Sequence, residues 1–327
     1  MSRLALRVLS AAFAGVIGFA LSAASLPTLD AAASASPPSN NSRARRGRAP
    51  ARGARASKPK PKCPAQPFVS QCALPFKSGV TPADHPIDQQ CPLQGNCHSG
   101  DGSLLQNEIK NNYCAMGTPV KIGVATIDNL QKDVDALVKK KQLTYGVGNK
   151  PPLRKDRPKL HNLETVDAKG NPITLSEGAL VTYEGFVFEA KHDDTFPLGF
   201  KGEGVNCNNP ALDFNDIHIA LVETSDIINA DECDSVTAEI IPHSRPDLWD
   251  RFDSNANTKK FVANPLPVVG LRIRVTGQLF FDGSHRPRPC AGPRRRSSWE
   301  VHPVYGIEVF DSGGFITLEK WAAKHHF

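Results

Sequence analysis

The chain has 327 residues, of which 40% are hydrophobic and 22% charged, so it is long enough to bury a core and is not disordered throughout. This composition excludes collagen, a coiled coil and a polytopic membrane protein. The formal charge is +6, but residues 1–62 hold 11 Lys and Arg against one acid, whereas residues 63–327 hold 28 basic and 32 acidic side chains. The part of the chain that is able to fold is therefore mildly acidic.

The N-terminus has the pattern of a secretory signal peptide. Arg3 and Arg7 precede an uncharged apolar stretch over residues 8–21, which is shorter than the roughly 20 residues needed to cross a membrane. Small residues suit cleavage after Ala24 or after Ala35, and the sequence does not decide between these sites. The alternative is an uncleaved N-terminal anchor. We expect a secreted or periplasmic protein whose mature chain has no transmembrane segment.

Residues 36–62 are predicted to be a basic disordered linker. They hold nine Lys and Arg and five Pro, with no Ile, Leu, Val, Met or aromatic residue. Such a segment buries too little apolar surface to offset the entropy of ordering it. It either attaches the protein electrostatically to an anionic envelope polymer, lipid or nucleic acid, or is a solvated spacer.

Eight cysteines follow this linker, and an even number in an exported chain favours disulfides. They are Cys63, Cys72, Cys91, Cys97, Cys114, Cys207, Cys233 and Cys290. Five lie between residues 63 and 114 and three between residues 207 and 290, so complete pairing requires at least one bridge between the two regions. The connectivity stays open. No cysteine group has the spacing of a haem or zinc motif, so we expect no cofactor and no metal.

Residues 63–145 are expected to form a small Cys-rich module. Its predicted elements are a helix that starts at the capping box of Ser103, a strand over 119–125, and a helix from Thr126 or Asp128 to about Lys141. Residues 146–178 are rich in Pro, Lys and Asp and are predicted to be a connecting loop.

After Gly178 the hydrophobic pattern changes to period two, which indicates strands. The predicted elements are strands over 179–190, 215–223 and 235–241, a short helix over 246–252, and strands over 271–282 and 298–310. This order is that of a five-stranded OB-like Greek-key barrel. We therefore predict an α+β fold, mainly β, in which a disulfide-linked N-terminal α/β module precedes the barrel over 179–310 and a tail follows over 311–327.

Four runs of the sequence, NDIHIALVE, TAEIIPHSRPDLWDRF, RIRVTGQLFFDGSH and SSWEVHPVYGIEVF, carry a resemblance. They are similar to those of an uncharacterised family of exported bacterial proteins with an OB-like barrel. The resemblance covers most of residues 91–310 and implies the fold and the exported setting. It implies no activity and no site residues.

Alternation along the strands sorts the barrel residues into two faces. The residues expected to point inward are Ile217, Ile219, Val236, Ala238, Ile240, Ile273, Val275, Trp299 and Val301. Those expected to point outward are Asp216, His218, Glu239, Arg272, Arg274, Glu300 and His302. His218 and Glu239 should be cross-strand neighbours, joined by Asp216, on the face that commonly binds ligands in this fold.

Three interpretations of these polar residues remain open. They form a solvated or ion-paired barrel exterior, a divalent metal site, or a face that recognises a glycan, a nucleotide or the edge of a protein. The loop between the last two predicted strands adds Arg294, Arg295 and Arg296, which are able to contact phosphates or carboxylates. That loop has no Phe, Tyr or Trp on which bases could stack.

We expect an exported binding module whose ligand is unknown. It would engage an anionic partner, a polysaccharide, nucleic acid or protein, through the barrel face and the Arg-rich loop. The predicted ligand-binding residues are Arg272, Arg274, Arg294, Arg295, Arg296 and His302. One alternative is a metal-assisted phosphoesterase or nuclease centred on Asp216, His218 and Glu239, and another is a structural envelope protein without a small ligand. The sequence has no nucleophile elbow and no P-loop, so an enzyme is the less favoured interpretation.

Overall fold

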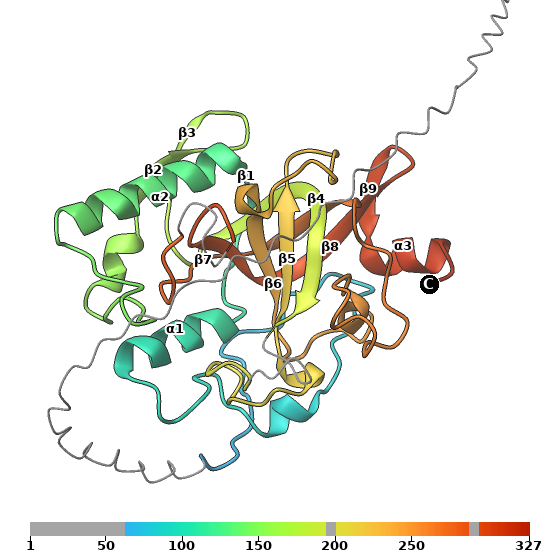
Figure 1. Ribbon diagram of the computed structural model, residues 1–327, viewed down its shortest axis with the longest axis horizontal. Helices are drawn as coiled ribbons and strands as arrows, with labels where there is room; N and C mark the ends of the chain where they lie inside the picture. Colours follow the sequence, from blue (N-terminus) through green and yellow to red (C-terminus); the bar gives the residue numbers. More distant parts are fainter. Residues whose placement is uncertain (1–62, 194–200, 288–293) are drawn as a thin grey trace, which may run out of the picture. The chain divides into compact units, whose positions relative to one another are not determined.

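The structure is a computed structural model that describes residues 63–193, 201–287 and 294–327 (Figure 1). The expected signal peptide, its alternative cleavage sites and the basic linker lie outside the described residues, as does Cys290.

The centre of the fold is a closed five-stranded β-barrel. Its strands are β4 (Leu180–His192), β5 (Ile217–Val222), β6 (Val236–Ile240), β7 (Arg272–Phe281) and β8 (Trp299–Asp311). β4 pairs antiparallel with β5 and β5 with β6, β6 runs parallel to β8, and β7 pairs antiparallel with both β8 and β4 to close the ring. This is the strand order of an OB-like Greek key, so the predicted fold class is confirmed.

The barrel interior is the main hydrophobic core. All nine residues predicted to point inward are buried in it, and they are joined there by Leu221, Phe281 and Ile307. Closure also requires a glycine where β7 crosses β8. A Cβ on Gly277 would lie 2.4 Å from the carbonyl oxygen of Pro303, so no other residue fits without moving the backbone.

The N-terminal part contributes α1 (Asp101–Asn111), β1 (Val120–Ile122) and α2 (Val124–Lys139), and β1 adds to the barrel sheet parallel to β4. Both helices begin two residues before their earliest predicted starts, at Asp101 and Val124. The predicted capping box at Ser103 is not formed, because the Gln106 amide donates to Asp282 and Ser284 instead. The described residues from Cys63 to Phe327 belong to one compact unit.

Three other predicted segments differ from the structure. The short helix expected over 246–252 is only a 3-10 turn, Trp249–Arg251. The expected connecting loop contains a 3-10 helix, Arg157–Leu160, and a hairpin of β2 (Leu163–Val166) and β3 (Pro172–Leu175). The expected tail contains β9 (Gly314–Thr317), paired with β8, and α3 (Leu318–Lys324). α3 is ordered because its Leu318 and Trp321 reach the main core, which sequence periodicity over so few residues does not reveal.

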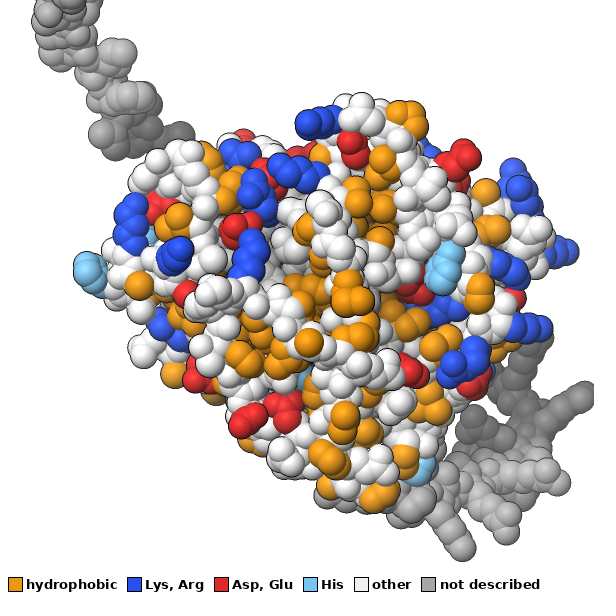
Figure 2. Space-filling view, turned by 180° about the vertical axis from the view of Figure 1, so that it is seen from behind, with side chains coloured by type: hydrophobic (Ala, Val, Ile, Leu, Met, Phe, Trp, Pro, Cys, Tyr) orange, Lys and Arg blue, Asp and Glu red, His pale blue; other side chains and the backbone are white. Residues whose placement is uncertain are grey.

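One face of the molecule shows how its charged side chains are distributed. On the face shown in Figure 2, apolar side chains occupy much of the middle, and Lys and Arg lie mostly toward the edges, with Asp and Glu among them. This face shows no continuous basic stripe of the kind that follows a polyanion.

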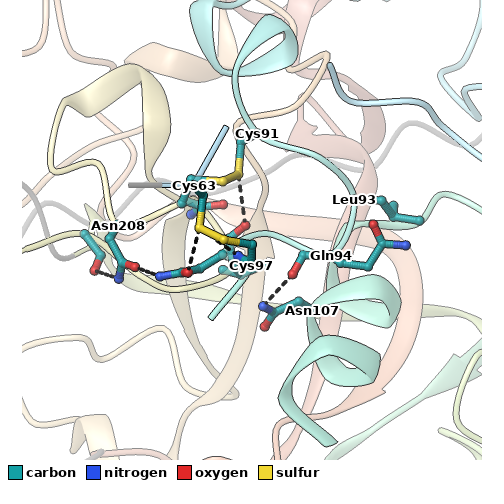
Figure 3. Close-up of a disulfide and its surroundings, with 12 residues drawn as sticks. Cys63, Cys91, Leu93, Gln94, Cys97, Asn107 and Asn208 are labelled. Atoms are coloured by element: carbon teal, nitrogen blue, oxygen red, sulfur yellow. Dashed lines mark hydrogen bonds between the residues drawn. A yellow bond between two sulfur atoms is a disulfide. The ribbon is translucent and has the colours of Figure 1, made fainter. Parts of the chain in front are cut away.

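Disulfides connect the N-terminal segment to itself and to the barrel (Figure 3). Cys63 is bonded to Cys97 and Cys72 to Cys114, while Cys91 is bonded to Cys207 across 116 residues. The last bond joins the two cysteine regions, which confirms the prediction from their odd counts. Cys233 is also disulfide-bonded, and the described residues include no free cysteine.

Candidate functional site

A cavity of about 670 Å³ lies where β4, β5 and β6 meet α1 and the loops around residues 203, 257 and 284, and we call it the histidine cavity. Every described residue that lines it is polar. Its acidic lining residues are Asp193, Glu203, Glu239 and Asp282, and its basic or imidazole ones are Lys110, Lys191, His192, His218, His285 and Arg295.

Two of the three residues proposed for a catalytic centre are direct neighbours. His218 on β5 is paired with Glu239 on β6, as predicted, and its Nε2 contacts the Oε1 of Glu239. Asp216 reaches the pair only through Lys110, whose Nζ lies 3.6 Å from Asp216 Oδ2 and 3.4 Å from Glu239 Oε2. The three residues therefore converge, but around a lysine that sequence reasoning did not single out.

Lys110 is the centre of a buried charge cluster. It lies near the end of α1, and its Nζ is also 3.6 Å from Glu203 Oε2. Burial disfavours the charged ammonium, yet the carboxylates of Glu203, Glu239 and Asp216 hold the pKa of Lys110 well above its usual value. The amino group is thus a permanent cation that faces three carboxyl groups.

His302 and Glu300 are on the outward side of β8, as predicted, but neither is accessible to solvent. Gln278 donates from Nε2 to the carbonyls of both His302 and Ile109, which holds α1 over this part of the barrel. His302 Nδ1 lies 2.6 Å from Glu239 Oε2, and although burial opposes it, Glu239 raises the pKa of His302 to about 9. Of the predicted solvated or ion-paired exterior, this part of the barrel is therefore ion-paired but not solvated, since β-strand alternation gives a face but not what covers it.

The arginines predicted to bind a ligand form ion pairs with acidic residues of the same chain. Arg295 is buried, with Nη2 2.8 Å from Asp282 Oδ2 and Nη1 in contact with Glu300. Arg294 lies 3.1 Å from both Asp231 and Glu232.

The other arginines of that prediction lie elsewhere. Arg296 lies 3.4 Å from both Asp128 and Asp234. Arg272 and Arg274 pair with Glu184 on β4 and stack over the ring of Phe315. With His302 buried, the six predicted ligand-binding residues do not form one surface.

His218 is held as a cation. Its Nε2 lies 3.3 Å from Asp193 Oδ2, in addition to the contact with Glu239, and its side chain is 26% exposed. Burial opposes the charge, but these carboxylates raise the pKa of His218 to about 10. At neutral pH the ring is an imidazolium that borders the cavity.

A second histidine of the cavity, His192, is held in the opposite state. It is the last residue of β4, and its Nδ1 lies 2.7 Å from Oδ2 of the fully buried Asp253. Asp253 also accepts from the backbone amides of His192 and Asn255 and from the Thr258 hydroxyl. A carboxylate with these donors accepts from Nδ1, so the neutral ring presents Nε2 as an acceptor.

The surroundings of His192 favour this neutral form. Burial and the charge of Arg245 hold the pKa of His192 below its usual value. The ring lies between the histidine cavity and a smaller cavity of about 400 Å³. Sequence reasoning missed this pair, because 61 residues separate its members and neither belongs to a recognisable motif.

Asp216, Glu239 and His302 also offer ligand atoms within 4.8 Å of one another, as a metal site would. The ammonium of Lys110 already lies beside both carboxylates and supplies a compensating positive charge. A divalent ion that bound here would have to displace this ammonium group.

Comparison with known proteins adds no relative: no protein-family model, curated protein or solved structure matches the chain. Within the described ranges, no helix combines the length and the apolar character needed to cross a bilayer.

Proposed function

We propose that this protein is an exported acid–base hydrolase that acts on a small polar substrate in the histidine cavity. The observation that carries the proposal is that two histidines of opposite charge state, His192 and His218, line the same cavity. Pairs of titratable groups whose surroundings drive them to different protonation states are characteristic of acid–base catalysis. The exported setting is supported by the disulfides, which persist mainly in oxidising compartments.

Each histidine has a distinct role in the proposed reaction. Neutral His192, oriented by Asp253, accepts a proton from water at Nε2 and so generates the nucleophile. Cationic His218 donates to the oxygen or nitrogen of the leaving group. Lys191, which is one-third exposed in the cavity wall, stabilises negative charge that develops on the substrate.

This proposal places the function in the cavity rather than in the Arg-rich loop. Binding of an anionic polymer through that loop, predicted from the sequence, has less support because Arg294, Arg295 and Arg296 are paired with acids of the same chain. The lining is polar and includes no Phe, Tyr or Trp among the described residues, which likewise favours a small hydrophilic substrate. The predicted metal-assisted reaction has less support because Lys110 supplies the cation beside Asp216 and Glu239.

The proposal is tested by comparing His192→Asn, His218→Asn and the control His161→Asn, whose side chain is exposed outside the cavity. Wild-type activity is first located with chromogenic esters, phosphodiesters and glycosides. We expect kcat/KM to fall by about 10²–10⁴-fold in the first two variants and to be unchanged in the third. Because the base must be deprotonated, kcat/KM of the wild type should rise with pH over a range below 6.5, the unperturbed histidine value.

A measurement without substrate checks the same assignment. Nitrogen-15 chemical shifts at pH 7 should show His192 neutral with its proton on Nδ1, and His218 with protons on both nitrogens. If both rings titrate together near pH 6.5, or if the three variants have equal activity, the proposed function is wrong.

A further inference from the structure

Glu203 is the only residue that the loop of residues 201–211 contributes to the histidine cavity. Its side chain is 30% exposed, while its Oε2 is buried and has no hydrogen-bond partner in the described part of the chain. Among the residues that the structure describes, the cation that lies near this oxygen is Lys110, at 3.6 Å. Glu203 therefore has an end directed at the charge cluster and enough exposure to meet a substrate.

Lys110 has one positive charge for three carboxyl groups, and Glu203 is the one whose carboxyl group has no second hydrogen-bond or ion-pair partner among the described residues. Glu239 also contacts His218 and His302, and Asp216 accepts from the Asn206 amide. When several carboxylates share too few cations, the least compensated one retains its proton. Burial, together with the charges of Asp216 and Glu239, raises the pKa of Glu203 to about 8 despite Lys110.

The loop that carries Glu203 is held to the N-terminal segment at closely spaced points. Cys207 is bonded to Cys91, and the backbone amide of Asn96 donates to the Gly204 carbonyl at 2.7 Å. Gly95 allows this approach, since a Cβ there would lie 2.5 Å from the same carbonyl oxygen. Figure 3 shows Cys91 together with Asn208, the residue that follows Cys207.

The position of Glu203 depends on that attachment, because the residues on both sides of it are glycines. Gly202 and Gly204 flank it, and Gly202 has a φ of +70°, so the free loop would have many conformations to lose. A disulfide across 116 residues removes much of this freedom. We expect the loop to move away from Lys110 when the bond is absent.

We propose that Glu203 is a third substrate-contacting residue, a neutral hydrogen-bond donor, and that the Cys91–Cys207 disulfide holds it in the cavity. This inference rests on the proposed hydrolase function. It assigns to the disulfide a role in activity as well as in stability, so the oxidised form is the active one.

The pH profile of kcat/KM tests the role of Glu203. A donor that titrates at about pH 8 should make activity fall as pH rises through 8. Glu203→Gln keeps a neutral donor and should lose that limb, so that activity falls only near pH 10, where His218 loses its proton. Glu203→Ala removes the donor and should reduce kcat/KM at least 10-fold at all pH values. The control Glu164→Gln, at an exposed position of β2, should match the wild type.

The disulfide is tested with Cys91→Ser/Cys207→Ser against Cys72→Ser/Cys114→Ser, a bond that is not attached to the loop of residues 201–211. The first pair should reduce kcat/KM as Glu203→Ala does and should speed amide hydrogen exchange over residues 201–211, and the second should do neither. The inference would be overturned by a wild-type kcat/KM that falls only near pH 10. It would also be overturned if the variant without the Cys91–Cys207 bond had unchanged hydrogen exchange and unchanged activity. Neither result would affect His192 and His218, whose nitrogen-15 shifts and variants decide the proposed function separately.

Discussion

At the scale of single residues, the main feature is a lysine that holds together groups from distant parts of the chain. Lys110 comes from α1, whereas Glu203, Asp216 and Glu239 come from a loop, the start of β5 and β6. Removing one member of a buried ion cluster destabilises the fold strongly, because its partners are left buried without a compensating charge.

Lys110→Met should therefore be strongly destabilising. We expect a loss of about 3–5 kcal/mol in the free energy of unfolding. The loss should be smaller at acidic pH, where the carboxylates left without Lys110 accept protons. Urea unfolding at pH 7 and pH 5 measures both effects. Lys132→Met, on the exposed side of α2, is the matched control and should cost nearly nothing. Equal stability of the two variants would contradict the central role of Lys110.

At the scale of elements, the barrel closes only because β7 and β8 approach very closely at one point. Gly277 lies at a register irregularity between these strands, and the space that its Cβ would need is occupied by Pro303 and Val301. Gly306, on the partner strand, has nothing within 4 Å of the corresponding position. Comparing the two glycines thus distinguishes a position where a side chain is sterically excluded from one where a side chain would fit.

Gly277→Ala should destabilise the protein by at least roughly 1–3 kcal/mol, the usual cost of overpacking a core. Gly306→Ala should be neutral or slightly stabilising, because alanine loses less backbone entropy on folding than glycine. Thermal and urea unfolding of both variants decide the comparison. A Gly306→Ala variant as unstable as Gly277→Ala would show that strand entropy, and not the crossing, governs these sites.

At the scale of the whole molecule, the buried titratable groups set how stability depends on pH. The pKa values of His218 and His302 are raised to about 10 and about 9, so their protonated forms stabilise the fold fully below pH 6.5, the usual histidine value. Glu203, with a pKa raised to about 8, also favours the protonated state when folded. These contributions are lost as pH rises. Glu239 and Asp282, whose pKa values are well below normal, contribute stability that is lost at low pH.

The thermal midpoint should therefore be highest in mildly acidic solution and fall as pH rises from about 6.5 to 10. Calorimetry across this range measures it. In His302→Gln the alkaline fall should be smaller, since one of the groups responsible is absent. A midpoint that stays constant up to pH 10 would show that the folded protein does not hold these protons.

Much of the barrel could be predicted from the sequence, because alternate residues of a strand lie on opposite faces of the sheet. The inward positions of Ile217, Val236, Val275 and Val301 follow from this alternation, and each is in the core. The pairing of His218 with Glu239 follows from the same local rule applied to two neighbouring strands.

The cavity could not be predicted in this way. Glu203 and Lys110 reach it, and Asp253 orients its His192, from three segments with no motif. The outward residues Glu300 and His302 gave no sign that α1 would cover them. Which groups become cations or stay neutral depends on burial and on charges brought in from elsewhere, which no local pattern contains.

The amino-acid sequence by itself thus determined the strand order of the barrel, its apolar interior and the need for a disulfide between the two cysteine regions. Each of these follows from local periodicity or from counting. Only the tertiary structure decided that the charged outer face is covered by α1, that Lys110 compensates its carboxylates, and that His192 and His218 share one cavity. The physical reason is that charge–charge interaction and desolvation depend on distance in space, and the residues concerned are far apart along the chain.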